Sequence, residues 1–114
     1  MIYVHPDRAK RNGRRIEGRF KLGQRVLIID DLVTSGGSIV ETAQVLHDEG
    51  LEVKDAIVLI EREEHAHERL RQHGINLASL LNLRAMLNHY MAANVISDEW
   101  FRKSMAYLDR KRAP

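Results

Sequence analysis

The 114-residue sequence contains no cysteine, only 2 prolines and only 5% aromatic residues. The absence of cysteine excludes disulfide bonds, thiolate metal ligands and cysteine catalysis. The shortage of aromatic side chains argues against stacking platforms for single-stranded nucleic acid. No apolar run approaches the roughly 20 residues that cross a bilayer, and the polar first residues do not form a secretory signal. We therefore expect one small, soluble, cytoplasmic domain without a membrane partner.

Charge is unevenly distributed, although the formal net charge is only +2. Residues 1–25 carry eight basic and two acidic residues. Residues 26–101 carry five basic and thirteen acidic residues, and residues 102–114 carry five basic residues and one acidic residue. A basic segment beside an acidic body predicts either an anion-binding segment or a solvated arm. No helix-turn-helix, zinc-finger or RNA-binding signature accompanies the charge, so we expect no nucleic-acid partner.

Continuous apolar runs at 26–29 and 56–60 predict strands that are buried on both faces of a parallel sheet. A short strand is expected at 2–4, a weaker one at 77–81, and a long loop at 5–23. Because helical patterns alternate with these strands, the sequence predicts an α/β fold. In such a fold, ligands bind beyond the carboxyl ends of the strands.

Helices are expected between and after these strands. Ser38 and Glu41 have the spacing of a capping box, which predicts a helix that begins at Ile39 and stops at Gly50. Further helices are expected at about 64–73, at 83–91 and from 97 onward.

The segment between the first long strand and its helix carries the chemistry. Asp30 and Asp31 end the expected strand, and residues 34–38 read Thr-Ser-Gly-Gly-Ser. Backbone N–H groups, hydroxyls and the positive end of a helix dipole favour a phosphate group in such a turn. The two carboxylates would repel that phosphate but suit the vicinal hydroxyls of a ribose. The residues therefore predict a sugar-phosphate ligand, and the pattern of a P-loop is absent.

The stretch 26–38 resembles the phosphoribosyl pyrophosphate (PRPP) motif of type I phosphoribosyltransferases. The apolar strand, the acidic pair and the turn all occur at the positions that the motif requires. Ile16-Glu17-Gly18 and Leu59-Ile60-Glu61-Arg62-Glu63 narrow the resemblance to orotate phosphoribosyltransferase. The resemblance implies that family's parallel sheet without the N-terminal strand or strands and the hood, so the chain would correspond to the carboxyl-terminal part. It implies one domain over 1–114, with 5–23 as a mobile catalytic-type loop.

The resemblance also implies an activity: ribose 5-phosphate would pass from PRPP to orotate, giving orotidine 5′-phosphate and pyrophosphate in pyrimidine nucleotide synthesis. Mg²⁺ would be carried by the pyrophosphate, without a metal ligand from the protein. Lys10, Asp30 and Asp31 would be catalytic, Ser35 to Ser38 would hold the 5′-phosphate, and Arg62 would grip the orotate carboxylate. The implied substrate-binding residues are His5, Asn12, Asp30, Asp31, Leu32, Val33, Thr34, Ser35, Gly36, Gly37, Ser38 and Arg62.

Several positions depart from the family pattern. His5 stands near an expected arginine, Asn12 stands near an expected histidine, and His65-Ala66 replaces paired glycines. The pyrophosphate-binding loop would belong to the lacking part, and each lost contact of this kind costs on the order of 10²-fold in rate. We therefore expect weak ribose-phosphate binding and poor turnover. We also expect a homodimer or a complementing subunit, because the family is dimeric and an incomplete sheet makes a marginal core.

Other interpretations stay open at this point. The pocket could serve a non-catalytic ribose-phosphate sensor, or a subunit that completes a split enzyme. A receiver-type signalling domain also begins with Ile-Ile-Asp-Asp, but its next strand would need a terminal aspartate where this sequence has Glu61. Arg62 could form an ordinary ion pair at a strand end. His65 and His67, two apart on an expected helix, make a poor metal pair.

Overall fold

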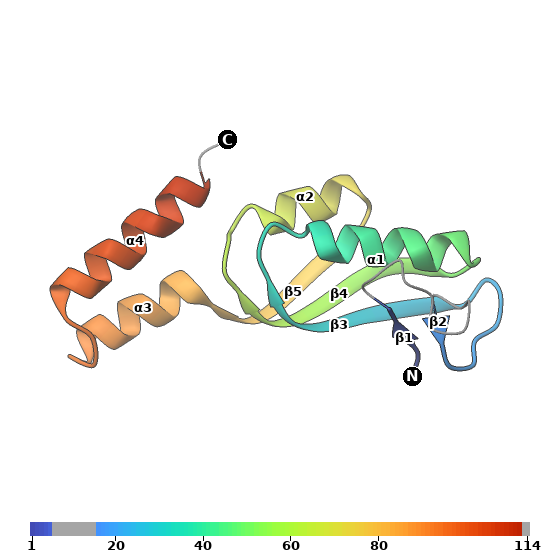
Figure 1. The fold of residues 1–114 in the computed structure, drawn as a ribbon, viewed down its shortest axis with the longest axis horizontal. Helices are drawn as coiled ribbons and strands as arrows, with labels where there is room; N and C mark the ends of the chain where they lie inside the picture. Colours follow the sequence, from blue (N-terminus) through green and yellow to red (C-terminus); the bar gives the residue numbers. More distant parts are fainter. Residues whose placement is uncertain (6–15, 113–114) are drawn as a thin grey trace.

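The computed structural model describes residues 1–5 and 16–112, without the side chains of 111 and 112. Its elements in chain order are β1 (Tyr3–Val4), β2 (Ile16–Glu17), β3 (Arg25–Val33), α1 (Gly37–Asp48), β4 (Glu52–Glu61), α2 (Ala66–Gln72), β5 (Asn76–Asn82), α3 (Leu83–Ala92) and α4 (Asp98–Arg112) (Figure 1). The strands β3, β4 and β5 form a parallel sheet in that order, whereas β1 and β2 form a separate antiparallel pair. The α/β class with a parallel sheet is confirmed.

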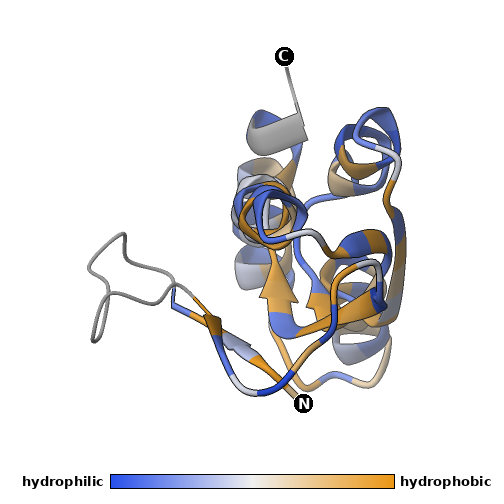
Figure 2. Cartoon of the chain, turned by 90° about the vertical axis from the view of Figure 1, so that its right-hand side faces the viewer, coloured by the Kyte–Doolittle hydropathy of each residue, from blue (hydrophilic) through white to orange (hydrophobic). Residues whose placement is uncertain are grey.

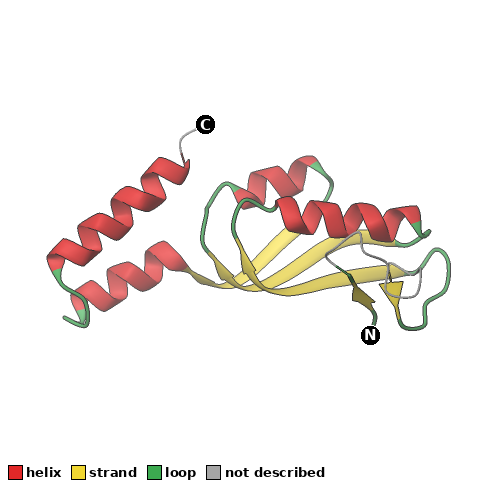
Figure 3. Cartoon of the chain, in the orientation of Figure 1, coloured by secondary structure: helices red, strands yellow, loops and turns green. Residues whose placement is uncertain are grey.

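Helices α1 and α2 lie on the same face of the parallel sheet (Figure 3). The connections from β3 to β4 and from β4 to β5 advance in one direction, and right-handed crossovers then place both helices on one face. The core lies in this helix–sheet layer and also includes Ile16 of β2. Its buried residues are Ile16, Ile28, Val33, Ile39, Leu46, Leu51, Ala56, Val58, Ala66, Leu70 and Ile75. Beyond the end of β5, α3 and α4 pack against each other and extend the molecule (Figure 1).

The expected burial of the strands on both faces is wrong. Side chains alternate between the faces of a strand, and Ile28 is buried on the helix side while Ile29 is 76% exposed on the other side. Leu27 and Leu59 are also exposed. Apolar side chains on this face are typical of a sheet that is covered by helices on both faces. In the part of the chain that the structure describes, however, helices cover only one face.

Element boundaries also differ from those expected. Helix α1 begins at Gly37, and its N-cap is Gly36 without a side-chain cap, so the capping box of Ser38 and Glu41 is not formed. Gly50 ends the helix region at a φ of 83°, as predicted. Strand β4 begins four residues early, at Glu52, because Glu52 pairs in register with Arg25. Strand β2 falls within the expected 5–23 loop.

Candidate functional site

The acidic pair lies within β3, which continues to Val33, so the prediction that the pair ends the strand is wrong by two residues. Neighbouring strand residues ordinarily point to opposite faces, but the carboxyl groups of Asp30 and Asp31 lie close enough together that, besides burial, a side-chain hydrogen bond and charge repulsion from Asp31 help to raise the pKa of Asp30. Asp30 lines a groove of about 800 Å³ that Ser38 also lines. The Asp31 backbone N–H donates to the Asp30 carboxylate over 2.8 Å. Partial burial raises the pKa of Asp30 from its ordinary value of 3.8, so the carboxylate beside the groove is less acidic than one in water.

The turn at 34–36 connects β3 to α1 through a left-handed glycine. Gly36 has a φ of 87°, which favours glycine over any L residue. A side chain here would also meet Leu70 of α2, with its Cβ 3.3 Å from Leu70 Cγ. The Gly37 N–H donates to Ser35 Oγ over 3.4 Å. The first turn of α1 leaves N–H groups without partners inside the helix, and this geometry suits an anionic ligand.

Arg69 lies beside the same turn, although no motif in the sequence indicated a role for it. Its Nη2 lies 3.6 Å from the position that a Cβ at Gly37 would take. Arg69 belongs to α2, which shares a sheet face with α1, so the crossover geometry brings this cation to the beginning of α1. The signal in the sequence would have been a basic residue next to a buried one, Leu70, on the following crossover helix.

Arg62 lies at the carboxyl edge of the sheet, next to the end of β3. Its backbone N–H donates to the carbonyl of Val33 over 3.0 Å. Its guanidinium forms an ion pair with the nearly buried Glu63, with Nη2 3.2 Å from Oε1. Arg62 lines a separate cavity of about 10 Å³, rather than the groove beside Asp30. The ordinary strand-end ion pair is therefore present, and the contact with orotate stays a prediction.

The other predicted residues lie at several places. His5 lines the groove from the β1 side, and its Nε2 lies 3.1 Å from Glu17 Oε1. Leu32 is exposed and Val33 is buried at the end of β3. Lys10, Asn12 and most of the loop expected at 5–23 lie in 6–15, outside the described residues.

Residues 1–5 and 16–112 contain neither a cluster of metal-ligating side chains nor a helix that could span a membrane. No group of three or more His, Cys, Asp or Glu side chains in this part of the chain could hold a metal ion. His67 and His65 contact different carboxylates, those of Glu61 and Glu63. None of the helices described there has the length and apolar character needed to span a membrane. Mg²⁺ carried by a pyrophosphate stays a prediction.

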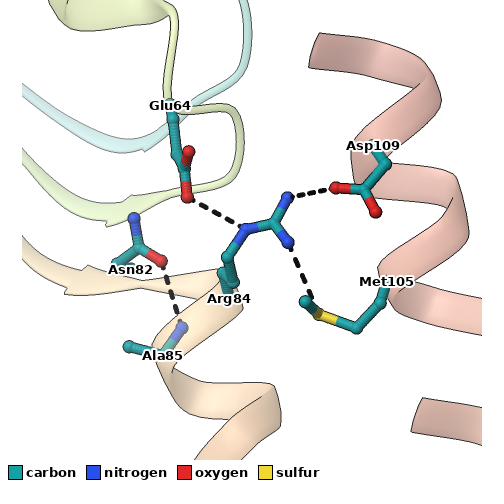
Figure 4. Close-up of polar contacts among 6 residues, drawn as sticks. All are labelled: Glu64, Asn82, Arg84, Ala85, Met105 and Asp109. Atoms are coloured by element: carbon teal, nitrogen blue, oxygen red, sulfur yellow. Dashed lines mark hydrogen bonds and ion pairs between the residues drawn. The ribbon is translucent and has the colours of Figure 1, made fainter. Parts of the chain in front are cut away.

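Helix α4 is fixed to the connection between β4 and α2 by Arg84 (Figure 4). The Arg84 Nε donates to Glu64 Oε1 and its Nη2 donates to Asp109 Oδ1, both over 2.9 Å. The hydrogen bond with Asp109 raises the pKa of Arg84. Because Glu64 lies two residues after Arg62, α4 is attached to the segment that carries Arg62.

The fold and the turn together define a parallel α/β domain with a strand–turn–helix unit whose geometry suits an anionic ligand. Residues 17–75, more than half of the chain, match the phosphoribosyl transferase domain. The chain therefore belongs to the phosphoribosyl transferase domain family. This assignment confirms the resemblance in the sequence and leaves no place for the receiver-type alternative.

Known proteins agree with the assignment. Uridine 5′-monophosphate synthase of Bos taurus is 47% identical over 74 residues, which cover 65% of this chain and 15% of that protein. The structure of Leishmania donovani UMP synthase has a TM-score of 0.81 and 34% identity over 96% of this chain and 24% of its own. Mycobacterium tuberculosis orotate phosphoribosyltransferase in complex with PRPP has a TM-score of 0.58 and 33% identity, covering 64% of this chain and 44% of its own.

The chain spans less than half the length of the curated relatives that it matches, between 15% and 46%. Orotate phosphoribosyltransferases are among these relatives, including that of Pyrococcus furiosus, which is 37% identical over 86 residues. The expectation that the chain corresponds to part of the orotate phosphoribosyltransferase family is confirmed.

Proposed function

We propose that the chain binds PRPP and transfers its ribose 5-phosphate to orotate, giving orotidine 5′-phosphate and pyrophosphate in pyrimidine nucleotide synthesis. The observation that carries the proposal is the left-handed turn at Gly36, which leads into the beginning of α1 beside Asp30. Further support comes from the relative that was solved with PRPP and from the relatives named orotate phosphoribosyltransferase.

In the proposed reaction, a ring nitrogen of orotate attacks C1 of the ribose as the bond from C1 to the pyrophosphate oxygen breaks. Pyrophosphate leaves with the electron pair of that bond, and the transition state resembles an oxocarbenium ion. The protein supplies positioning and charge stabilisation rather than a nucleophile. The turn from Ser35 to Ser38 holds the 5′-phosphate, Asp30 and Asp31 accept hydrogen bonds from the ribose hydroxyls, and Arg62 binds the orotate carboxylate. Lys10 and Mg²⁺ neutralise the leaving pyrophosphate.

Calorimetric titration of the chain with PRPP and Mg²⁺ tests the binding site. We expect binding that Asp30→Asn and Asp31→Asn each weaken by at least about tenfold, because each removes a charge-assisted hydrogen bond. Asp55→Asn is the matched control, since Asp55 is exposed in β4 and lies away from the turn. Equal affinity for all the variants, or no heat of binding for the wild-type chain, would contradict the proposal.

An assay of orotidine 5′-phosphate synthesis then separates an enzyme from a binding module. We expect turnover well below that of complete relatives, because the chain spans less than half of their length and each missing electrostatic contact costs on the order of 10²-fold. PRPP binding without any turnover would instead favour the non-catalytic sensor. Turnover at the rate of complete relatives would contradict the expected impairment.

A subunit that completes a split enzyme is the second candidate, and the exposed sheet face favours it. An apolar face such as that formed by Leu27, Ile29 and Leu59 is characteristic of an interaction surface. A homodimer is proposed for the same reason. Restoration of orotate turnover by addition of the part that the chain lacks would identify the complementing subunit.

A further inference from the structure

The guanidinium of Arg62 is already paired with a carboxylate of the chain itself. Its Nη2 lies 3.2 Å from Oε1 of Glu63, whose side chain is only 7% exposed. A carboxylate this deeply buried needs a cation as its partner, so Glu63 stays beside Arg62. The Arg62 Nε is also buried and has no hydrogen-bond partner among the described residues, so the pair leaves part of the guanidinium unsatisfied. The carboxylate of a ligand would therefore meet a cation whose charge Glu63 already offsets.

His65 contacts the second oxygen of the same carboxylate. Its Nε2 lies 3.2 Å from Glu63 Oε2. Because an ionised carboxylate only accepts hydrogen bonds, Nε2 carries the ring proton in this contact. The Nδ1 atom has no hydrogen-bond partner in the described part of the chain and can take a second proton. His65 stands at a position where the sequence departs from paired glycines, and a glycine could not bind Glu63 through a side chain. We call Arg62, Glu63 and His65 the Arg62 cluster.

The charged groups next to the Arg62 cluster come from α3, α4 and the β4–α2 connection. A cavity of about 10 Å³ beside the cluster is also lined by Glu64, Arg84 and Leu108. Arg84 of α3 bonds to Glu64 and to Asp109 of α4, both over 2.9 Å (Figure 4). Because Arg84 lies between two carboxylates, its charge is offset locally, and the charge of the Arg62 cluster is set by its own three members.

Two other histidines of the described chain pair with glutamates and serve for comparison. His67 Nε2 lies 2.9 Å from Glu61 Oε2, which also accepts a hydrogen bond from Ser79. His5 Nε2 lies 3.1 Å from Glu17 Oε1, at the end of a β1–β2 pair that lies to one side of the sheet (Figure 2). Of these three pairs, the pair of His65 is the one whose glutamate also binds an arginine within the described residues.

The charge of the Arg62 cluster depends on whether His65 is protonated. With a neutral imidazole, one guanidinium and one carboxylate sum to zero. With an imidazolium, the sum is one positive charge, because Glu63 is then shared between two cations. An anionic group near Arg62 is bound more tightly in the second state, and histidine is the side chain that ordinarily gains its charge between about pH 8 and pH 5.

We infer that Glu63 and His65 are positioning residues that act through Arg62 and set how strongly the site prefers a pyrimidine that carries a carboxylate. The inference rests on the proposed function, from which it takes the contact of Arg62 with the base. Glu63 weakens the preference by offsetting the guanidinium, and a proton on His65 restores it by offsetting Glu63. A purely structural ion pair at the end of β4 would change stability but not this preference.

Calorimetric titration of the full chain with orotidine 5′-phosphate and with uridine 5′-phosphate tests the inference. The two nucleotides differ only in the base carboxylate, so ionisation of the phosphate that they share cancels in a comparison. We define the preference ratio as the Kd for uridine 5′-phosphate divided by the Kd for orotidine 5′-phosphate. For the wild-type chain, we expect this ratio to rise at least about threefold between about pH 8 and pH 6.

Three variants show which groups set the preference ratio. Glu63→Gln should raise it at least about fivefold at about pH 8, because the amide keeps the size of the side chain and can still accept from Arg62 but carries no charge. His65→Gln should keep the ratio near the wild-type value of about pH 8 at every pH, because it removes the titrating ring. His67→Gln is the matched control, since His67 pairs with Glu61 instead of Glu63, and its ratio should follow pH as that of the wild type does.

The inference is overturned if Glu63→Gln leaves the preference ratio unchanged, if His65→Gln retains the pH dependence, or if His67→Gln loses it equally. It is also overturned if the wild-type chain binds both nucleotides equally at every pH, a result that would leave the ribose-phosphate site of the proposed function in place. If neither nucleotide binds, the proposed site itself fails and the inference falls with it. Should Glu63→Gln not fold, the pH profiles of the wild type and of the two histidine variants decide the outcome.

Discussion

At the scale of single residues, the shape of the turn before α1 depends on Gly36. Two properties make glycine necessary there, the φ of 87° and the proximity of Leu70. Gly23 has a similar φ of 82° but has no heavy atom within 4 Å of a built Cβ. Comparison of alanine substitutions at Gly23 and Gly36 therefore separates the cost of backbone strain from the cost of crowding.

We expect Gly23→Ala to lower the free energy of unfolding by about 1 kcal/mol, through backbone strain. Gly36→Ala should lower the free energy of unfolding by at least about 1 kcal/mol more than Gly23→Ala does, because its methyl group crowds Leu70. Urea denaturation of both variants measures the difference. Gly36→Ala should also weaken PRPP binding, since the turn must shift. Equal destabilisation of the two variants would show that the contact with Leu70 carries no cost.

Arg69 lies where it can neutralise a phosphate bound at the turn. Arg69 is an exposed residue, so we expect Arg69→Gln to cost only about 0.5–1 kcal/mol of binding free energy, or about two- to fivefold in the Kd for PRPP. The effect should shrink at high salt. Arg71→Gln is the matched control, because Arg71 of the same helix pairs with Glu68. Calorimetric titration at two salt concentrations measures the change in the Kd for PRPP and its dependence on salt. Equal effects of the two variants would exclude a specific role for Arg69.

Asp30 makes the stability of the fold depend on pH, because its ionisation lowers the free energy of unfolding. Its pKa is raised in the folded chain chiefly by burial, so folding favours the protonated form and ionisation is destabilising. Asp30→Asn should therefore be more stable than the wild type at pH 7. The advantage should vanish as the pH falls through the raised pKa toward the ordinary value of 3.8. Urea denaturation at a series of pH values measures it, and a difference independent of pH would contradict the argument.

At the scale of elements, the apolar runs were sufficient to predict β3 and β4, since their lengths and β-branched residues favour buried strands. The beginning of α1 was not predictable in the same way. Ser38 has the spacing of a capping residue, but the left-handed Gly36 begins the helix earlier, at a position where the chain lies close to Leu70 of α2. The proximity of Arg69 to the turn depends on the same tertiary contact.

Arg84 determines how α4 is held against the rest of the chain. Its side chain is 22% exposed and bonds to Glu64 and Asp109 at 2.9 Å. We expect Arg84→Met to reduce the local stability of α4 by about 1–2 kcal/mol, because two short charge-assisted bonds are lost. Amide hydrogen exchange of α4 measures this change.

The control for Arg84 is Arg102→Met, which removes a 3.6 Å ion pair within α4 between exposed side chains. Such an exposed pair is worth about 0.5 kcal/mol or less. If the two variants increased exchange in α4 equally, the contact of Arg84 with Glu64 would contribute nothing to the attachment of α4.

At the scale of the whole molecule, the chain is more extended than a compact domain of its length. Its Cα radius of gyration is 17.0 Å, against about 13 Å for a compact domain of this size. The α3–α4 pair extends beyond the sheet, and the sheet has one layer of helices rather than two (Figure 3). The sequence alone could not reveal this arrangement, because apolar strands such as β3 read as doubly buried whether or not their second layer is present.

The exposed sheet face leads to a last prediction, that the isolated chain associates with itself. Apolar surface of this extent is favourable to bury, and Leu80, at 73% exposure, lies within it. Light scattering at micromolar concentration should give a mass above the 13.2 kDa of one chain. Leu80→Glu should lower that mass, whereas Val95→Glu, far from the sheet in sequence, should leave it unchanged. A wild-type monomer under these conditions would show that the face is tolerated in water, and an equal effect of both variants would place the association elsewhere.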